Sequence, residues 1–103
     1  MTVEEAIDSY WDAISNYNGA KANLNSIVSE LKLSKGSLDD FSGTLNEVYS
    51  LDGNDSLLCT KIKNTREDIT TTASFISNNV IPAVDRAIIH CHNKIAELEA
   101  GDY

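Results

Sequence analysis

The sequence predicts an all-α protein in which two long helical arms of nearly equal length form an antiparallel hairpin. Three observations lead to this prediction. Apolar residues recur at helical spacing along most of the chain, a polar segment at residues 51–56 interrupts them at the midpoint, and the 103 residues include one proline and five glycines. A chain of this length is expected to form a single domain, residues 1–103.

The first arm, predicted at about residues 3–50, carries an apolar stripe with a seven-residue repeat. When position a is placed at Val3, every a position as far as Leu45 is apolar or aromatic. Position d holds Ala6, Ala13, Ala20, Ile27, Ser34, Phe41 and Val48, and position e adds Ile7, Ile14, Val28 and Tyr49. Strand alternation cannot produce a stripe of this period, so the arm is predicted to be helical.

Positions a and d are expected to face a neighbouring helix. Three alanines at d near the N-terminus allow that helix to approach closely, whereas Ile27 and Phe41 hold it further away nearer the midpoint. The segment Ser34–Ser37 leaves two alternatives: one helix runs through it, or a second helix begins at about residue 38. The uninterrupted repeat favours one continuous helix.

The segment 51–56 is predicted to be the turn between the arms. Asp52, Gly53 and Asn54 suit a helix end, because these residue types adopt left-handed conformations or bond their own backbone. The spacing also imitates the start of a calcium loop. Leu57 stands where that loop needs glycine, and Lys63 stands where it needs a bidentate glutamate, so no metal site is predicted.

The second arm, predicted at about residues 57–100, carries its own stripe, which changes phase once. Its members are Leu58, Ile62, Thr65, Ile69, Thr72, Ile76, Val80, Val84, Ile88, Cys91, Ile95 and Leu98. The spacing alternates between three and four residues except around Val80, where two fours follow each other, close to Pro82. We therefore expect a kink near residues 78–82, between helices at about 56–78 and 82–100.

Two packed helices leave much of such a wide stripe uncovered, which predicts a surface that binds another protein. Trp11 lies at position b, beside the stripe, where a large aromatic is either lateral core or the anchor of a contact with another chain. The residues predicted to bind a partner are Tyr10, Trp11, Tyr17, Leu24, Leu31, Ile62, Ile69 and Ile76.

Charge limits the range of partners. The net charge is −8, which repels phosphate backbones and anionic lipid, so nucleic acid is not an expected partner. The one basic patch, Lys61, Lys63 and Arg66, is interpreted as a solvated face.

Acidic residues occupy the start of the chain, where a signal peptide would be basic, and no apolar run is long enough to span a membrane. The expected location is the cytoplasm.

The segment His90-Cys91-His92 is the only cluster of ligand-type side chains. Adjacent residues of a helix point about 100 degrees apart, so the three cannot converge on one metal ion. Cys91 falls on the apolar stripe and is expected to be buried. The sequence contains no phosphate-binding glycine loop and no arrangement of nucleophile, base and acid, so no cofactor and no enzymatic activity are predicted.

Two arrangements would bury the part of the apolar stripe that the two helices leave exposed. In one, two hairpins from two chains, identical or different, complete a four-helix bundle. In the other, the chain folds its kinked arms into a compact bundle of its own. The first describes an obligate partner protein, and the second describes a small four-helix immunity or regulatory protein that binds a toxin.

The layout resembles that of the WXG-type, Esx-like proteins of bacterial type VII secretion, and more closely that of the small accessory partners of LXG toxins. Those proteins place a W-x-G tripeptide at the central turn, where this chain has Leu51-Asp52-Gly53 and keeps only the glycine. Their Y-x-x-x-D/E export signal is missing, since Ile14 and Lys21 follow Tyr10 and Tyr17 at the required position.

This resemblance implies a helper without enzymatic activity. Such a protein binds the helical N-terminal domain of a larger secreted effector and presents it to the secretion machinery. It also implies that the chain either stays in the cytoplasm or leaves the cell with its partner by a route that needs no signal peptide.

Overall fold

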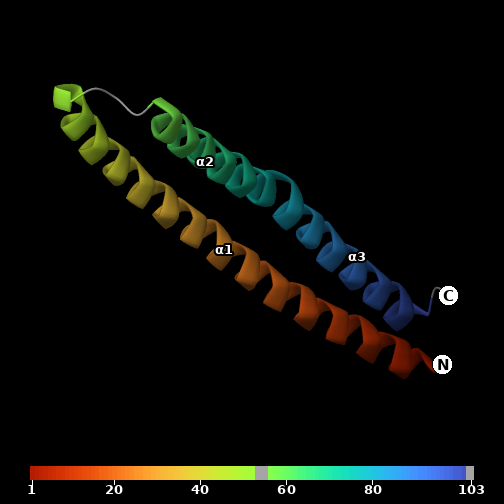
Figure 1. Cartoon of the computed structure of the whole chain (residues 1–103). Helices are drawn as coiled ribbons and strands as arrows, with labels where there is room; N and C mark the ends of the chain where they lie inside the picture. Colours follow the sequence, from red (N-terminus) through yellow and green to blue (C-terminus); the bar gives the residue numbers. More distant parts are fainter. Residues whose placement is uncertain (53–55, 102–103) are drawn as a thin grey trace. The chain divides into compact units, whose positions relative to one another are not determined.

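The computed structural model describes residues 1–52 and 56–101, with the side chains of residues 1–45 and 58–101. The chain is all-α: helix α1 spans Val3–Asp52, α2 spans Ser56–Phe75, a π-helical segment η1 spans Ile76–Val80, and α3 spans Ile81–Ala100 (Figure 1). The described residues contain no strand. The centre of the predicted turn, residues 53–55, lies outside the described residues.

Helix α1 begins with Thr2 as its N-cap. The Thr2 hydroxyl accepts a hydrogen bond from the backbone N–H of Glu5 at 3.1 Å and donates one to the Glu5 carboxylate at 3.2 Å. The first bond satisfies a backbone N–H that the first turn of a helix otherwise leaves without a partner. The helix then runs through Ser34–Ser37 without a break, which agrees with the first of the two alternatives for that segment.

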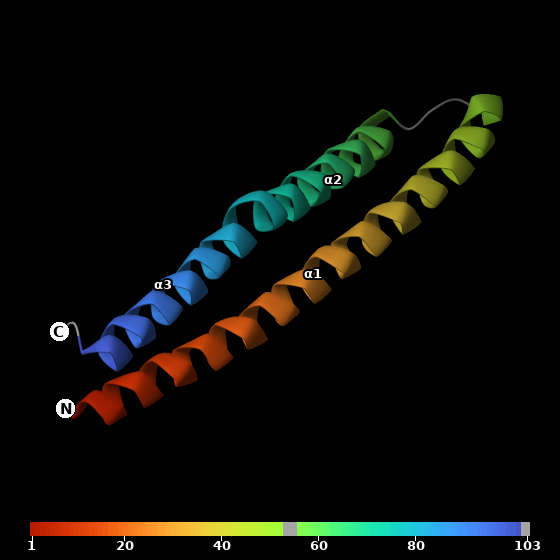
Figure 2. The same ribbon diagram turned by 180° about the vertical axis from the view of Figure 1, so that it is seen from behind.

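The chain divides into two compact units, which are described separately. Unit 1 comprises residues 1–25 and 77–103, and unit 2 comprises residues 26–76. Within unit 1, the N-terminal half of α1 and helix α3 lie side by side and run in opposite directions (Figures 1 and 2). Within unit 2, the C-terminal half of α1 and helix α2 do the same (Figure 2).

The apolar stripe of α1 was predicted at positions a, d and e, and its best-buried members among the described residues lie at e. Ile14 and Val28, both at position e, are among the buried side chains, whereas Ile27 and Phe41, at position d, are exposed. The prediction that Ile27 and Phe41 separate two facing helices is therefore wrong. The β-branched Ile14 and Val28 remove more apolar surface from water than alanine would, while Ala13 at position d still packs against the core of unit 1.

Unit 1 has a contiguous core between α1 and α3. Ile14, Cys91 and Ile95 are buried together at 4–6% exposure, with Ile7, Tyr10, Ala13 and Ile88 packed against them. Cys91 is therefore a small buried hydrophobic residue with a free thiol, as its place on the stripe predicted.

In α2 the stripe is shifted from the prediction at two positions. Thr65 and Thr72 are exposed, and their neighbours Arg66 and Ala73 lie on the inner side, where Ala73 is buried. The Thr65 hydroxyl donates a hydrogen bond to the Lys61 carbonyl of its own helix at 2.9 Å.

The predicted phase change appears as the π-helical segment η1, and α3 follows with Pro82 in its first turn. A π-helix bonds residues five apart, so its wider turn accommodates two successive spacings of four residues. Proline is tolerated there because the first turn of a helix does not use its N–H groups. The kink predicted at residues 78–82 is thus a local widening between two helices.

Candidate partner-binding surfaces

The residues predicted to bind a partner occupy three kinds of position. Ile62 is buried within unit 2, so its side chain is already covered by this chain. A second group is half-buried along the contact between helices: Tyr10, Leu24, Leu31, Ile69 and Ile76. Tyr17 and Trp11 are exposed. Only the last two present a large apolar surface without any rearrangement of their unit.

In unit 1, Trp11 lies on one flank of the contact between α1 and α3. Its ring meets that of His92 edge to face, with centroids 5.5 Å apart and planes at 83°. The Trp11 side chain remains 47% exposed, and Ile89, one helical turn before His92, is 58% exposed. The contact holds the indole ring in place while much of it remains open to solvent, which suits an anchor for another chain.

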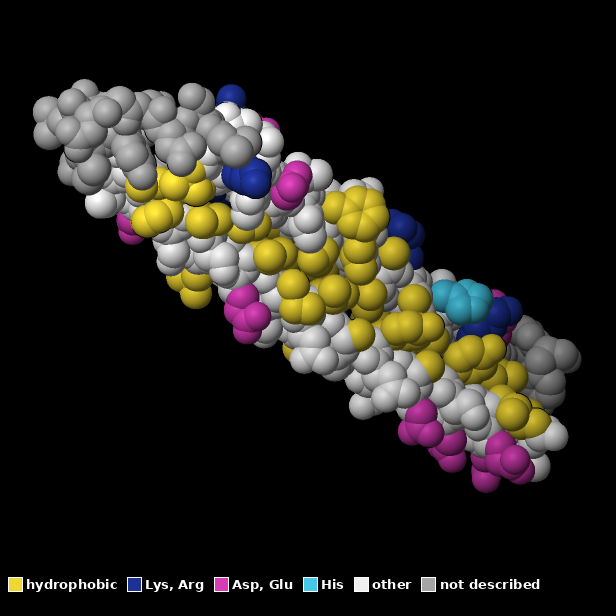
Figure 3. Space-filling model, viewed as in Figure 1, with side chains coloured by type: hydrophobic (Ala, Val, Ile, Leu, Met, Phe, Trp, Pro, Cys, Tyr) yellow, Lys and Arg dark blue, Asp and Glu magenta, His cyan; other side chains and the backbone are white. Residues whose placement is uncertain are grey.

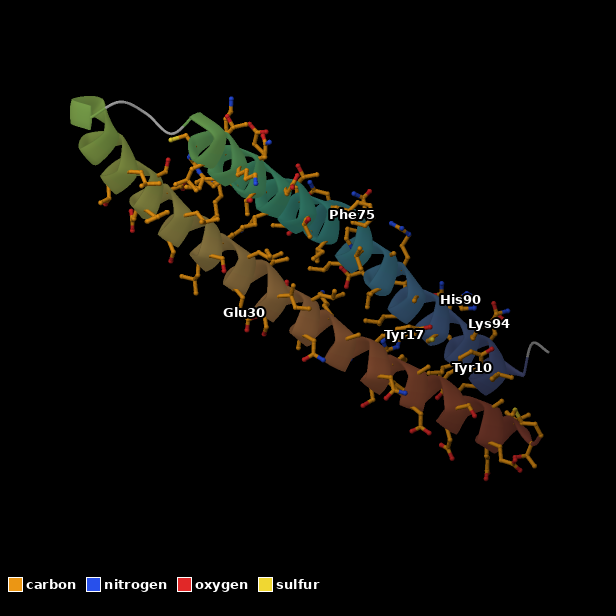
Figure 4. All side chains as sticks on the ribbon, in the orientation of Figure 1. Tyr10, Tyr17, Glu30, Phe75, His90 and Lys94 are labelled. Atoms are coloured by element: carbon orange, nitrogen blue, oxygen red, sulfur yellow. The ribbon has the colours of Figure 1, made fainter. Side chains whose placement is uncertain are left out.

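Tyr10 and Tyr17 lie between α1 and α3 in unit 1, whereas His90 and Lys94 lie on α3 (Figure 4). Hydrophobic side chains gather along this contact on the face shown in Figure 3, and acidic side chains follow the outer edge of α1. An apolar strip with an acidic border therefore runs along this face of unit 1.

In unit 2 the exposed apolar residues belong mainly to α1. Ile27 is 42% exposed and Phe41 is 50% exposed. Both occupy position d, two heptads apart, so they lie on the same flank about 21 Å from each other at 1.5 Å per residue. Leu33, at 73% exposure, occupies position c and faces away from the contact. The structure thus leaves two large apolar side chains, Ile27 and Phe41, partly exposed beside the contact between the helices.

This flank was not predicted as a binding surface. Ile27 and Phe41 were assigned to the interior because position d is apolar in most heptads of α1. One signal in the sequence distinguishes positions d and e. Position e has β-branched residues in the early heptads and lysine at residues 21 and 35, and each lysine has an acidic residue within reach once e faces inward.

A charged cluster closes the other flank of unit 2. Lys35 Nζ donates a hydrogen bond to Asp39 Oδ2 at 3.1 Å, and Arg66 Nε pairs with Asp39 Oδ1 across the two helices. The hydrogen bond from Lys35 is the main factor that lowers the pKa of Asp39 below its usual 3.8. The charge of Arg66 lowers it further, and desolvation partly opposes both effects.

A simpler ion pair occupies the corresponding flank of unit 1. Lys21 Nζ lies 2.8 Å from Asp85 Oδ1, which joins α1 to α3. Both side chains are about 40% exposed, at 39% and 44%. A pair this accessible to water contributes little to stability but helps to set the register of the two helices.

Within the described residues, no three His, Cys, Asp or Glu side chains are placed to hold a metal ion. His90 and His92 are exposed while Cys91 between them is buried, so the three side chains point in different directions. Among the described helices, none is long and apolar enough to cross a membrane.

No family model, curated protein or solved structure matches the chain.

Proposed function

We propose that this protein is a helical partner protein without enzymatic activity, which binds a helical domain of another protein along the exposed flank of α1. In this proposal the two arms form one antiparallel hairpin, and the partner supplies the helices that complete a four-helix bundle. The antiparallel packing inside each unit supports the hairpin, because each unit pairs one half of α1 with the second arm.

The observation that carries the proposal is the exposure of two side chains, Ile27 and Phe41. Both side chains are about half exposed, and both lie on the same flank of one helix. Complete burial of a large apolar side chain is worth about 1.5–3 kcal/mol, so their half-exposed surfaces leave favourable free energy unused. Contiguous apolar patches on a protein surface usually mark a binding site. The proposal places Ile27 and Phe41 at two points along one such interface.

Sparse burial within each unit supports the same conclusion. Among the described side chains, unit 1 buries Ile14, Cys91 and Ile95, and unit 2 buries Val28, Ile62 and Ala73. None of the described large side chains is fully buried. Two packed helices alone offer a small core, and a third and fourth helix would enclose the half-buried residues on the contact.

The class of partner comes from the resemblance to the accessory proteins of LXG toxins. It is the helical N-terminal domain of a larger effector that leaves the cell by type VII secretion. On this proposal the chain is made in the cytoplasm, binds the effector there, and either remains or leaves with it.

The proposal is tested by co-expression with the product of the neighbouring gene, followed by size-exclusion chromatography with light scattering. We expect a stable complex with the unaltered chain and none with Phe41→Asp, because the new carboxylate would be buried without a partner. Leu33→Asp is the matched control: it makes the same chemical change about 80 degrees around α1 from Phe41, at a side chain that is 73% exposed and faces away from the contact, and it should weaken the complex far less.

Circular dichroism of each variant alone separates loss of binding from loss of folding. A folded Phe41→Asp chain that still binds would place the interface elsewhere. A monodisperse, highly stable monomer that forms no complex would exclude the partner proposal and would favour a self-contained immunity or regulatory protein.

A further inference from the structure

Unit 2 contains a surface groove on the flank opposite to Ile27 and Phe41. Its volume is about 560 Å³, within the range of small-molecule sites. The groove is lined by Lys35 of α1 and by Lys63, Arg66, Glu67, Thr70 and Thr71 of α2. Three of these six side chains are cationic in a protein whose net charge is −8.

The cations of the groove are only partly neutralised. Asp39 accepts a hydrogen bond from Lys35 and forms an ion pair with Nε of Arg66. The two Nη nitrogens of Arg66 have no partner among the described residues. Lys63 forms no ion pair in the described part of the chain, although Glu67 lies four residues further along the same helix. Unpaired donors from two adjacent turns of α2 therefore border one groove.

Asp39 also restrains the site. By holding Arg66 Nε it restricts the guanidinium, and Nε and the Asp39 oxygen that it contacts are both shielded from solvent. A guanidinium restrained by a carboxylate loses less conformational freedom when it binds a ligand than a freely moving one does.

We propose that this groove binds the phosphate group of a small phosphorylated molecule. The Nη groups of Arg66 and the ammonium of Lys63 would donate to the phosphate oxygens, and the Thr71 hydroxyl would donate to a third. A phosphate dianion suits this set better than a carboxylate, because it carries more charge and offers acceptors in three directions. The groove would accommodate a larger body beyond the phosphate. This inference does not depend on the proposed partner.

The test is a titration of the isotopically labelled full chain with inorganic phosphate, followed by two-dimensional NMR of the backbone amides. Ionic strength is held constant with sodium chloride, and sodium acetate serves as the carboxylate control. We expect saturable shifts at Thr70 and Thr71 with phosphate and weaker, non-saturating shifts with acetate.

Lys63→Gln should weaken phosphate binding about tenfold, since it removes one charge-assisted hydrogen bond. Lys61→Gln is the matched control. It makes the same change on the same helix at a residue outside the groove, and it should alter the affinity less than twofold. Both lysines are exposed, so neither change is expected to unfold the chain.

Three results would overturn the proposal. If Lys61→Gln and Lys63→Gln weaken phosphate binding equally, the basic patch attracts anions in general and the groove is not a phosphate site. Equal binding of acetate would exclude a phosphate site, and linear shifts spread over the whole chain would indicate an adventitious ion only.

Discussion

Units 1 and 2 use the same helix, α1, but they join it to the second arm in different ways. Unit 1 has a contiguous core of Ile14, Cys91 and Ile95, and its ion pair Lys21–Asp85 is well exposed. Unit 2 has an ion-pair cluster between its helices at the equivalent row of α1, where Lys35 takes position e.

The difference shows how one row of a helix can change its role along its length. Position e of α1 carries Ile7, Ile14 and then Lys21 in unit 1, and Val28 and then Lys35 in unit 2. An isoleucine at this position contributes through apolar burial, whereas a lysine needs an acidic partner close to the contact. We therefore expect unit 1 to depend on packing and unit 2 to be more sensitive to pH and salt.

The largest effect is expected when the core of unit 1 is reduced. Ile95→Ala should lower the free energy of unfolding by about 2–4 kcal/mol, because it removes a side chain that is 4% exposed and leaves a cavity. Thermal and urea unfolding followed by circular dichroism measure the loss, and amide hydrogen exchange locates it.

Ile89→Ala makes the same change on the same helix at a residue that is 58% exposed, and it should cost less than about 0.5 kcal/mol. Similar losses for Ile95→Ala and Ile89→Ala would show that the core assigned to unit 1 is wrong.

A smaller effect, of opposite sign in the two units, is expected at two glycines. Gly101 has φ +80° and its N–H bonds the Glu97 and Leu98 carbonyls, so Gly101→Ala should destabilise the end of α3 by about 1 kcal/mol. Gly36 lies inside α1 with open space where a Cβ would stand, so Gly36→Ala should stabilise unit 2 by about 0.5–1 kcal/mol. Thermal unfolding of both variants checks these signs, and a loss of stability in Gly36→Ala would contradict a continuous α1.

The smallest expected effect is the contribution of Asp39 to the pH dependence of unit 2. Its pKa is lowered in the folded state, so its stabilising contribution is present above the usual pKa of 3.8 and is lost as the pH falls below it. Between pH 6 and pH 3 the unaltered chain should lose more stability than Asp39→Asn does.

Asp40→Asn is the control, because Asp40 is the exposed neighbour and forms no ion pair in the described residues. High salt should reduce the contribution of Asp39, since its side chain is about a third exposed, at 35%. Equal acid sensitivity of Asp39→Asn and the unaltered chain would mean that the cluster does not stabilise unit 2.

Most of the helical structure was predictable because it depends on local periodicity. The repeat from Val3 to Leu45 continued across Ser34–Ser37, and α1 is continuous there. The two successive spacings of four residues near Val80 predicted a break, and η1 lies at that place. These features follow from the positions of apolar residues along one helix, so they are visible without any neighbour.

The side of each helix that becomes buried was harder to predict. Position d and position e of α1 lie about 100 degrees apart, and both carry apolar residues. The prediction placed a, d and e together in one stripe, so the exposure of Ile27 and Phe41 was missed. Arg66 was assigned to a solvated face for a different reason. Its acidic partner Asp39 lies on the other helix, so the pair cannot be seen in the sequence around Arg66.

The sequence by itself determined an all-α chain, the extent of its helices and the place where the second arm changes phase. Only the tertiary structure decided which rows face each other and which apolar residues stay outside. The physical reason is that helix formation follows from residue spacing within one segment. Burial depends instead on the summed apolar area and charge pairing of two helices. Rotation of α1 by one position, from d to e, exchanges Ala13 for Ile14, Ile27 for Val28 and Phe41 for Ser42.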